Sequence, residues 1–326
     1  MPDASLGFHS TLAWLLEEFV LEKRGLGYCY KAGVNKLRQL ERLWRENPES
    51  PPALTREWAE RFISVRPTEN NSVSAIGRVG VWRQLARFCR RRGIDAYLPD
   101  ARSVPMVGAP YTPFIYTREQ VAALFAAADA LPIHCFSPRR PWAMGLLYRL
   151  LYGTGLRLSE ALGIHYRDFT PDTGILLVRR GKNRNERAIP VAPSVAERLR
   201  THIRLFPDEP DTPFFLSPRR RAALNISAVG IFFPRLLQAA DLPPRAGRKG
   251  PRIHDLRHTF AVHRMENWIR AGEDPEAKIP LLASYMGHVC LRDTYYYLRV
   301  TRQLFPMIAG RTQAHVGAIV PEGDHS

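Results

Sequence analysis

The stretch from Arg252 to Leu298 contains side chains that could bind a phosphodiester and attack it. His254 and Arg257 are three residues apart, and apolar residues follow at helical spacing, so the two side chains would share one face of a helix. A guanidinium is always charged and binds two phosphate oxygens at once. His288 comes next, and Tyr297, a possible nucleophile, stands nine residues beyond it.

A His-x-x-Arg pair recurs by chance, and a solvated basic helix with a hydrogen-bonded histidine would explain it equally well. The groups that precede it favour chemistry. Arg157 lies upstream, and Glu160 stands three residues after it, where a carboxylate could hold the guanidinium in place. An ordinary surface salt bridge is the alternative for Arg157 and Glu160.

The charge of the whole chain points to a polyanionic partner. Its 326 residues carry 47 Lys+Arg and 31 Asp+Glu, which gives a net charge of +16 and a pI near 10.2. Nucleic acid is the commonest partner of such a chain, and a basic enzyme of unrelated function is the alternative. A hydrophobic content of 45% is normal for a globular protein, and the length suits about two domains.

The cysteines and the apolar segments indicate a soluble protein of the cytoplasm. The four cysteines are far apart and form no Cys-x-x-Cys pair, so we expect reduced thiols and neither a disulfide framework nor a zinc site. The sequence begins with no signal-like region, and no apolar run approaches the roughly 20 residues that span a bilayer. We therefore expect no membrane association.

Residues 1–106 are predicted to form a helical bundle. Apolar residues recur at helical spacing in four segments, which lie at about 12–25, 34–47, 55–66 and 73–92. The fourth segment ends in three consecutive arginines, for which we expect DNA contact: Arg90, Arg91 and Arg92. A solvated helix end that complements the helix dipole is the alternative.

A linker at 107–115 is predicted to separate this bundle from a second domain at 116–326, because residues 99–113 are rich in Pro and Gly. Helical segments dominate that domain. Thr117 with Gln120 fits a capping box, Pro138 or Pro141 could start the next helix, and Ser194 with Glu197 fits a second capping box.

Strand-like runs interrupt these helices between residues 164 and 191, with turns between them. They predict a small antiparallel sheet with a first strand from Ile164 to Phe169. Lys182 and Arg184 lie at the tip of its second hairpin, where they could reach a DNA groove or a phosphate, although a hairpin lysine is usually only solvated. The fold class is mainly α with a small antiparallel sheet (α+β). A basic loop with Arg248 and Lys249 leads into His254.

The constellation resembles the tyrosine recombinase (phage integrase) family over roughly residues 115–305. Each motif is weak alone, but their order and spacing together are specific. Thr154 to Glu160 look like the family's first-arginine box, and Lys182 sits where the family carries its β-hairpin lysine. The remaining motifs look like the HxxR box, the LGH box with Met286 in place of leucine, and the nucleophile: His254-x-x-Arg257, Gly287-His288 and Tyr297.

The resemblance implies the role of each catalytic group. Arg157 and Arg257 would clamp the scissile phosphate, and Tyr297 would attack it to form a 3′-phosphotyrosyl link. Lys182 would protonate the departing 5′-oxygen. His254 would accept the tyrosine proton or hold a phosphate oxygen, and His288 would donate to the phosphate. No metal or cofactor is expected.

Tyr295 and Tyr296 precede Tyr297 directly, and on a helix the three side chains point in directions about 100° apart. Only one of them can face the phosphate, and the distance along the chain from His288 selects Tyr297. Amphipathic packing is the interpretation of the other two.

The family also implies how the protein works as a whole. Residues 1–106 would bind the core of a double-stranded DNA site, two protomers would occupy each site, and four would assemble in synapsis. We expect a site-specific recombinase of a mobile element that acts on the bacterial nucleoid. A DNA-relaxing enzyme of the type IB topoisomerase kind and a DNA-binding regulator without cleavage are the alternatives.

Overall fold

A computed structural model describes residues 6–47, 53–66, 69, 72–105, 112–133, 135, 137–179, 186–217, 222–242 and 250–304. Contacts between residues divide the chain into two compact units, Met1–Tyr111 and Thr112–Ser326. Within the described ranges, no helix is both long enough and apolar enough to cross a membrane.

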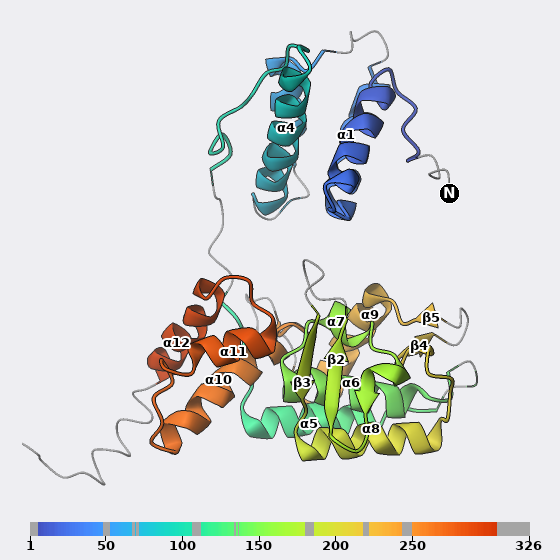
Figure 1. Cartoon of the computed structure of the whole chain (residues 1–326), viewed down its shortest axis with the longest axis vertical. Coiled ribbons are helices and arrows are strands. Elements are labelled where there is room, and N and C mark those ends of the chain that lie inside the picture. Colours follow the sequence, from blue (N-terminus) through green and yellow to red (C-terminus); the bar gives the residue numbers. More distant parts are fainter. Residues whose placement is uncertain are drawn as a thin grey trace, which may run out of the picture. The chain divides into compact units, whose positions relative to one another are not determined.

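The first unit contains four helices, α1 (Ala13–Gly25), α2 (Lys31–Arg45), α3 (Arg56–Ile63) and α4 (Val73–Arg91), as the apolar spacing predicts (Figure 1). The Thr55 hydroxyl accepts a hydrogen bond from the Trp58 amide and starts α3. Trp58 also stacks on Trp44 of α2, with 4.1 Å between ring centroids. These contacts join the helices around one apolar core.

Helix α4 packs on the core through Val81, Leu85 and Phe88 of its predicted apolar stripe, but its inner face also holds a charged residue. Val73 is 64% exposed, whereas the guanidinium-bearing Arg78 is buried on the inner face. Arg78 tolerates this position because its nitrogens donate to the Glu69 carboxylate, at 2.5 and 2.9 Å, and to the Ser64 carbonyl. A charged side chain thus occupies a position that hydrophobic periodicity assigns to an apolar one.

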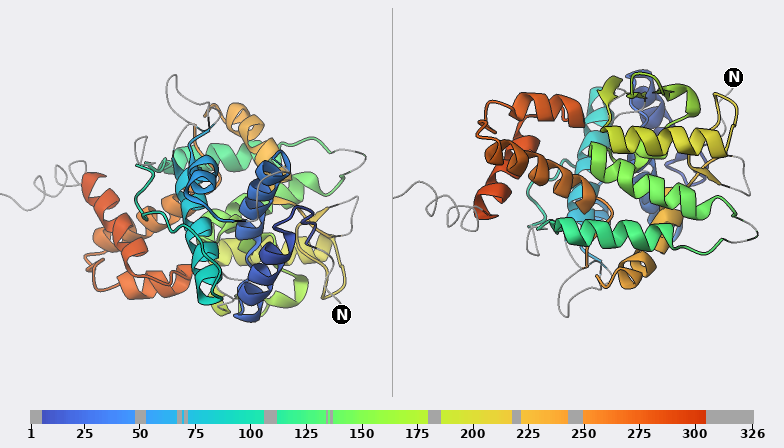
Figure 2. Two further views of the ribbon diagram at one scale, coloured as in Figure 1. Left: turned by 90° about the horizontal axis from the view of Figure 1, so that it is seen from above. Right: turned by 90° about the horizontal axis from the view of Figure 1, so that it is seen from below.

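The second unit contains a layer of helices. α5 (Arg118–Asp129), α6 (Arg140–Thr154) and α8 (Pro193–Leu205) lie side by side in the right view of Figure 2, and α9 (Ile226–Ala239) packs on α5. The capping box of Thr117 and Gln120 is present. Helix α6 begins at Arg140 with Pro141 in its first turn, the later of the two proline candidates.

The predicted capping box of Ser194 and Glu197 is wrong. Helix α8 begins two residues earlier than this cap predicts, with Ala192 as the N-cap, and Pro193 takes the first helical position, which its fixed φ angle suits. Ser194 therefore lies inside the first turn, and no side chain caps this helix.

A three-stranded antiparallel sheet packs on the helices, with β2 (Ile175–Val178) between β1 (Phe169–Thr170) and β3 (Arg187–Pro190). The first strand is shorter than predicted, because Tyr166–Asp168 form a 3-10 turn. The Asp168 carboxylate accepts the His165 amide at 2.9 Å and holds that turn. A second small sheet pairs β4 (Leu216–Ser217) with β5 (Ala222–Ala223). The predicted fold class, mainly helical with small antiparallel sheets, is confirmed.

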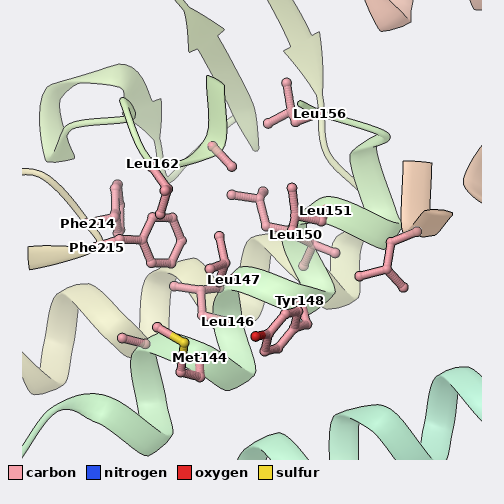
Figure 3. Close-up of a cluster of buried hydrophobic side chains, with 14 of the residues drawn as sticks. Met144, Leu146, Leu147, Tyr148, Leu150, Leu151, Leu156, Leu162, Phe214 and Phe215 are labelled. Carbon is pink, nitrogen blue, oxygen red and sulfur yellow. The ribbon is translucent and has the colours of Figure 1, made fainter. Parts of the chain in front are cut away.

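Side chains of α6 fill the space between the helices and the three-stranded sheet. Figure 3 shows Leu146, Leu147, Leu150 and Leu151 pointing into one buried cluster, together with residues from the following turns and from the loop before β4. Burying this apolar surface fixes the end of α6, from which the first arginine motif emerges.

Three helices form a second core in the same unit: α10 (Asp255–Arg270), α11 (Ile279–Met286) and α12 (Arg292–Leu304). Helix α10 contacts α6 on one side and α12 on the other. Its first turn therefore lies where the end of α6, the end of α11 and the side chains of α12 come together.

Candidate active site

Arg157 is positioned by a sharp turn after α6. Gly155 ends α6 with φ +63°, and Arg157 caps the short helix α7 (Leu158–Ala161). The Glu160 carboxylate accepts from the Arg157 amide at 3.0 Å and from its Nη1 at 2.9 Å. Glu160 is 2% exposed, so this contact is an internal ion pair rather than the surface salt bridge that was the alternative.

A second arginine, Arg187 of β3, shares the Glu160 carboxylate, and sequence reasoning missed it. Its Nη2 lies 3.0 Å from Glu160 Oε2, and its Nε donates to the Tyr285 carbonyl at 2.9 Å. The signal was present in the strand, because Arg187 is two residues from the buried Ile189 and so faces inward. A charge on the inner face of a strand needs a buried partner.

Gly287 lies directly over the Arg187 side chain. It ends α11 with φ +69°, and an added Cβ would come within 2.6 Å of Arg187 Nη1. Only glycine combines this left-handed backbone with so close an approach. The glycine of the Gly287-His288 motif thereby lets the end of α11 sit against the arginine cluster.

The Glu160 carboxylate stays ionised in this setting. Burial acts to raise its pKa, but the hydrogen bonds and charges of Arg187 and Arg157 outweigh burial and lower that pKa. Glu160 is therefore a fixed negative charge that orients two guanidiniums.

Arg257 lies at the centre of the site and is 2% exposed. Its Nη2 donates to the Met286 carbonyl at 3.0 Å, and its Nη1 donates to the Gly155 carbonyl. Arg157 reaches the neighbouring Gly287 carbonyl at 3.3 Å. Both guanidiniums are thus anchored on backbone at the end of α11, which carries partial negative charge.

The charge of Arg257 is not neutralised within the described residues, none of which forms an ion pair with it. Burial lowers the pKa of Arg257 to about 10, and the charge of Arg157 adds to this shift. Arg257 is still cationic at neutral pH. Arg157 and Arg187 share the Glu160 carboxylate, and Arg257 has no carboxylate partner in the described part of the chain. This excess positive charge favours an anion such as a phosphate.

His254 and His288 are neutral at pH 7. Burial together with nearby arginines lowers the pKa of His288 to about 4. Loss of water around part of the His254 ring, with the charges of Arg257 and Arg157, lowers the pKa of His254 to about 4 as well. His254 is solvent-exposed by its accessible surface, and water at its exposed edge weakens that shift.

Tyr297 turns inward at this site. It is 3% exposed, whereas Tyr295 is 49% exposed and points away. The His288 ring stacks against Tyr297 with 6.0 Å between centroids, and His288 Nδ1 lies 2.7 Å from the hydroxyl of the buried Thr294. Burial raises the pKa of Tyr297, and the charge of Arg257 opposes that shift only in part. The phenol is therefore protonated at neutral pH.

These side chains line one open cavity of about 430 Å³. Its lining consists of the five described members of the predicted catalytic set and four further residues: Arg157, His254, Arg257, His288 and Tyr297, with His258, Arg292, Asp293 and Tyr296. The cavity can admit a phosphate group between the guanidiniums and the phenol. Among the described residues, no three His, Cys, Asp or Glu side chains are grouped so as to hold a metal ion.

The remaining predicted residues fall into two groups. Lys182, Arg184, Arg248 and Lys249 lie outside the described residues. The three arginines at the end of α4 each have a partner in their own unit: Arg90 with the Ala96 carbonyl, Arg91 with Glu22 and Arg92 with Glu18. Their contact with DNA stays a prediction.

Comparison with known proteins identifies the family. Residues 115–303, more than half of the chain, match the model of the phage integrase family. An inferred integrase/recombinase of Sinorhizobium fredii, y4rE, is 31% identical over 309 residues, which cover 93% of this chain and 96% of that protein. The chain belongs to the phage integrase family.

This tyrosine recombinase is also similar to the tyrosine recombinase XerC of Nitrobacter winogradskyi, with 29% identity over 268 residues, 75% of this chain and 78% of XerC. It is accordingly a site-specific recombinase by family. A crystal structure of a lambda integrase tetramer bound to a Holliday junction matches its fold with a TM-score of 0.64 at 18% identity, over 88% of this chain and 76% of that one. XerH bound to a difH substrate matches with a TM-score of 0.61 at 19% identity, over 85% and 79%.

Proposed function

We propose that this recombinase cuts and rejoins DNA through a covalent 3′-phosphotyrosyl intermediate on Tyr297. One observation carries the proposal: an inward-facing tyrosine shares a cavity with the guanidiniums of Arg157, Arg257 and Arg292, which outnumber the one acidic residue of the lining, Asp293. A tyrosine that served only in packing would have no need of this charge. The geometry therefore suits nucleophilic attack on a bound phosphate.

Arg157 and Arg257 hold the phosphate in this proposal. Both side chains are fixed before DNA binds, by Glu160 and by the carbonyl groups of Gly287, Gly155 and Met286. Donors that are fixed in advance need no reorganisation when charge builds on the pentavalent phosphorus, so they stabilise the transition state more than the ground state.

His288 donates a hydrogen bond to the same phosphate. If Thr294 donates its hydroxyl proton to His288 Nδ1, the neutral ring carries its own proton on Nε2. That N–H is then available for a phosphate oxygen. Lys182, in the connection between the paired strands β2 and β3, protonates the departing 5′-oxygen.

The partner is double-stranded DNA, with two protomers on each site and four in synapsis. The net charge of +16 supports a polyanionic partner. The similarly folded lambda integrase forms a tetramer on a Holliday junction. Residues 1–106 bind the core of the site, and the further DNA contacts come from Arg90, Arg91, Arg92, Arg184, Arg248 and Lys249.

The biological setting is a mobile element of a bacterial cell, where the enzyme acts on the nucleoid. Similarity to a relative of the integrase/recombinase kind over nearly its whole length supports this setting. The chemistry needs neither ATP nor a cofactor, since the covalent link conserves the free energy of the phosphodiester.

A trapping assay tests the proposal. Duplexes with a randomised core are first selected for binding to the wild-type protein, and the selected sequence is then built with a nick close to the site of attack. Incubation in EDTA followed by denaturing electrophoresis should show a DNA-linked protein band for wild type and for Tyr295→Phe, and none for Tyr297→Phe.

Other outcomes would point elsewhere. A band that persists in Tyr297→Phe assigns the nucleophile to a neighbouring tyrosine. Relaxation of supercoiled DNA without strand exchange between two sites favours the topoisomerase alternative. Tight binding without any covalent band favours a DNA-binding regulator and contradicts the proposal.

A further inference from the structure

We propose that His258 accepts the phenolic proton of Tyr297 when the tyrosine attacks DNA, a role that rests on the proposed function. His258 follows Arg257 directly on α10 and lines the same cavity as Tyr297. The resemblance to the family implies that His254 either accepts this proton or holds a phosphate oxygen. The contacts of His254, His258 and His288 indicate which of the three accepts the proton.

Among the described histidines, His258 has the ring that lies nearest to the ring of Tyr297. Its ring centroid lies 5.5 Å from that of Tyr297, compared with 6.0 Å for His288. Among the described side chains, no ring contact joins His254 to Tyr297. His254 instead lies edge-on against His258, with 5.0 Å between centroids and 88° between planes. His258 therefore contacts both His254 and Tyr297.

His288, the other histidine whose ring contacts Tyr297, already has a hydrogen-bond partner. His288 Nδ1 is bonded to the Thr294 hydroxyl, and its ring is nearly parallel to that of Tyr297, with 17° between planes. A ring nitrogen exchanges protons in the plane of its own ring, so a parallel stack is a poor geometry for transfer between the two. His258 is inclined by 55° to the Tyr297 ring, which lets its edge approach the phenol.

His258 also has a ring nitrogen without a partner among the described residues. Its Nδ1 is buried and has no hydrogen-bond partner among the described residues. Buried polar atoms are normally bonded, so an exception at a cavity that contains a nucleophile calls for an explanation. The proposed transfer requires the Tyr297 hydroxyl to reach this nitrogen during attack.

The charges around His258 explain when it can act. It faces His254, Arg257 and Arg252 from its own helix and the preceding turn, His288 from the end of α11, and Tyr296 and Tyr297 from α12. Burial and these mostly positive neighbours lower its pKa to about 3 in the free protein. A bound phosphate offsets the arginine charges and raises the basicity of His258. The base is thereby activated only when DNA is in place.

Cleavage transfers one proton from Tyr297 to His258. The phenolic O–H bond of Tyr297 breaks as its oxygen bonds to phosphorus, and the proton goes to His258 Nδ1. The phosphorus–5′-oxygen bond breaks, and the leaving oxygen takes a proton from the general acid. In the rejoining step the 5′-hydroxyl attacks, and His258 returns its proton to the departing phenolate.

The test uses the full chain and the nicked duplex selected above. His258→Phe keeps an aromatic ring but removes both nitrogens, and His263→Phe is the matched control, because His263 is on the same helix but does not line the cavity. Single-turnover cleavage at pH 7 should fall about 100-fold in His258→Phe, the usual contribution of a proton acceptor, and should stay near wild type in His263→Phe.

The pH profile distinguishes a proton acceptor from a packing residue. Without His258 the phenol must ionise by itself, so the rate of His258→Phe should rise about tenfold per pH unit from pH 7 to 9 and approach wild type. A loss that is the same at every pH, or a loss below about threefold, overturns the role. His258→Asn, with its melting temperature and DNA affinity measured, replaces His258→Phe if the latter does not fold.

A sulfur substitution locates the defect. A duplex whose 5′-bridging oxygen is replaced by sulfur has a leaving group that needs no acid, so it should restore cleavage to Lys182→Ala but not to His258→Phe. Restoration of His258→Phe would assign His258 to the leaving group and overturn the proposal. A wild-type protein that gives no covalent product overturns the proposed function itself, which is a different result from an active wild type with an active His258→Phe.

Discussion

Among the residues that the structure describes, each unit buries one arginine almost completely, and the contacts of the two differ. Arg78 in the first unit is 1% exposed and Arg257 in the second is 2% exposed. Arg78 donates to the Glu69 carboxylate through two nitrogens, and Arg78 in turn lowers the pKa of Glu69 to about 2. Arg257 donates to backbone carbonyls, and no described carboxylate pairs with it.

Arg78 carries a structural charge, and Arg257 carries the functional charge of our proposal. A buried ion pair is complete within the folded chain and presents no net charge to a ligand. A buried guanidinium that is anchored only on dipoles keeps its charge, at a cost in folding free energy, and can offer it to an anion. The second unit therefore stores positive charge in the cavity where a phosphate would bind.

The largest expected effect comes from removing the functional charge. Arg257→Met should lower single-turnover cleavage about 10³-fold or more, because a fixed donor to the transition state is lost. Its melting temperature should stay within about 3 °C of wild type, since loss of an unpaired buried charge compensates for the lost hydrogen bonds. A large drop in melting temperature would contradict the comparison.

Removing the structural charge should have the opposite pattern. Arg78→Met breaks a buried ion pair and should destabilise the first unit by about 3 kcal/mol, the low end for such pairs because Glu69 keeps some solvent contact. Urea denaturation measures the change. At 10 °C, where the variant stays folded, cleavage of a bound duplex should be near wild type, and a loss as deep as that of Arg257→Met would refute the assignment.

The orienting carboxylate should have an intermediate effect. Glu160→Gln removes the charge that fixes Arg157 and Arg187, and misplacing the clamp should slow cleavage about 10- to 100-fold. Glu197→Gln is the matched control, because Glu197 also pairs with two arginines, Arg200 and Arg204, but is 56% exposed. Its rate should not change. Equal rates for the two variants would remove Glu160 from the machinery.

The smallest expected effect is a difference in acid stability between the two units. His202 and His263 are buried in the second unit, and burial lowers the pKa of each to about 4. As pH falls, these histidines take up protons in the unfolded chain near pH 6.5, before they do so in the folded protein. This unit should therefore lose stability as pH falls from about 6.5 through 4. Glu69 in the first unit loses its contribution only as pH falls from about 4.5 towards 2.

Hydrogen exchange followed by mass spectrometry, corrected for the intrinsic rate at each pH, reports on the two units separately. Between pH 7 and 5.5, protection should fall in α8 and α10 and hold in α3 and α4. An equal loss in both units would show that the histidines of the second unit do not control its acid response.

The sequence by itself determined most of the helices and the types of residue in the cavity. Helical spacing and local capping depend on residues three or four positions apart, and so the four helices of the first unit and the Thr117 cap follow from the chain alone. The predictions that are wrong were also local. Ser194 competed with Pro193 for the helix start, and Asp168 turned a strand-like run into a 3-10 turn.

Only the tertiary structure decided how the charges are connected. Arg187 meets Glu160 from 27 positions away, Arg257 meets the Gly155 carbonyl from 102, and Arg157 meets the Gly287 carbonyl from 130. No local pattern specifies such pairings, because they depend on how α10 packs between the two cores of the second unit. The sequence supplied the arginines, and packing decided which of the described ones pair with a carboxylate and which do not.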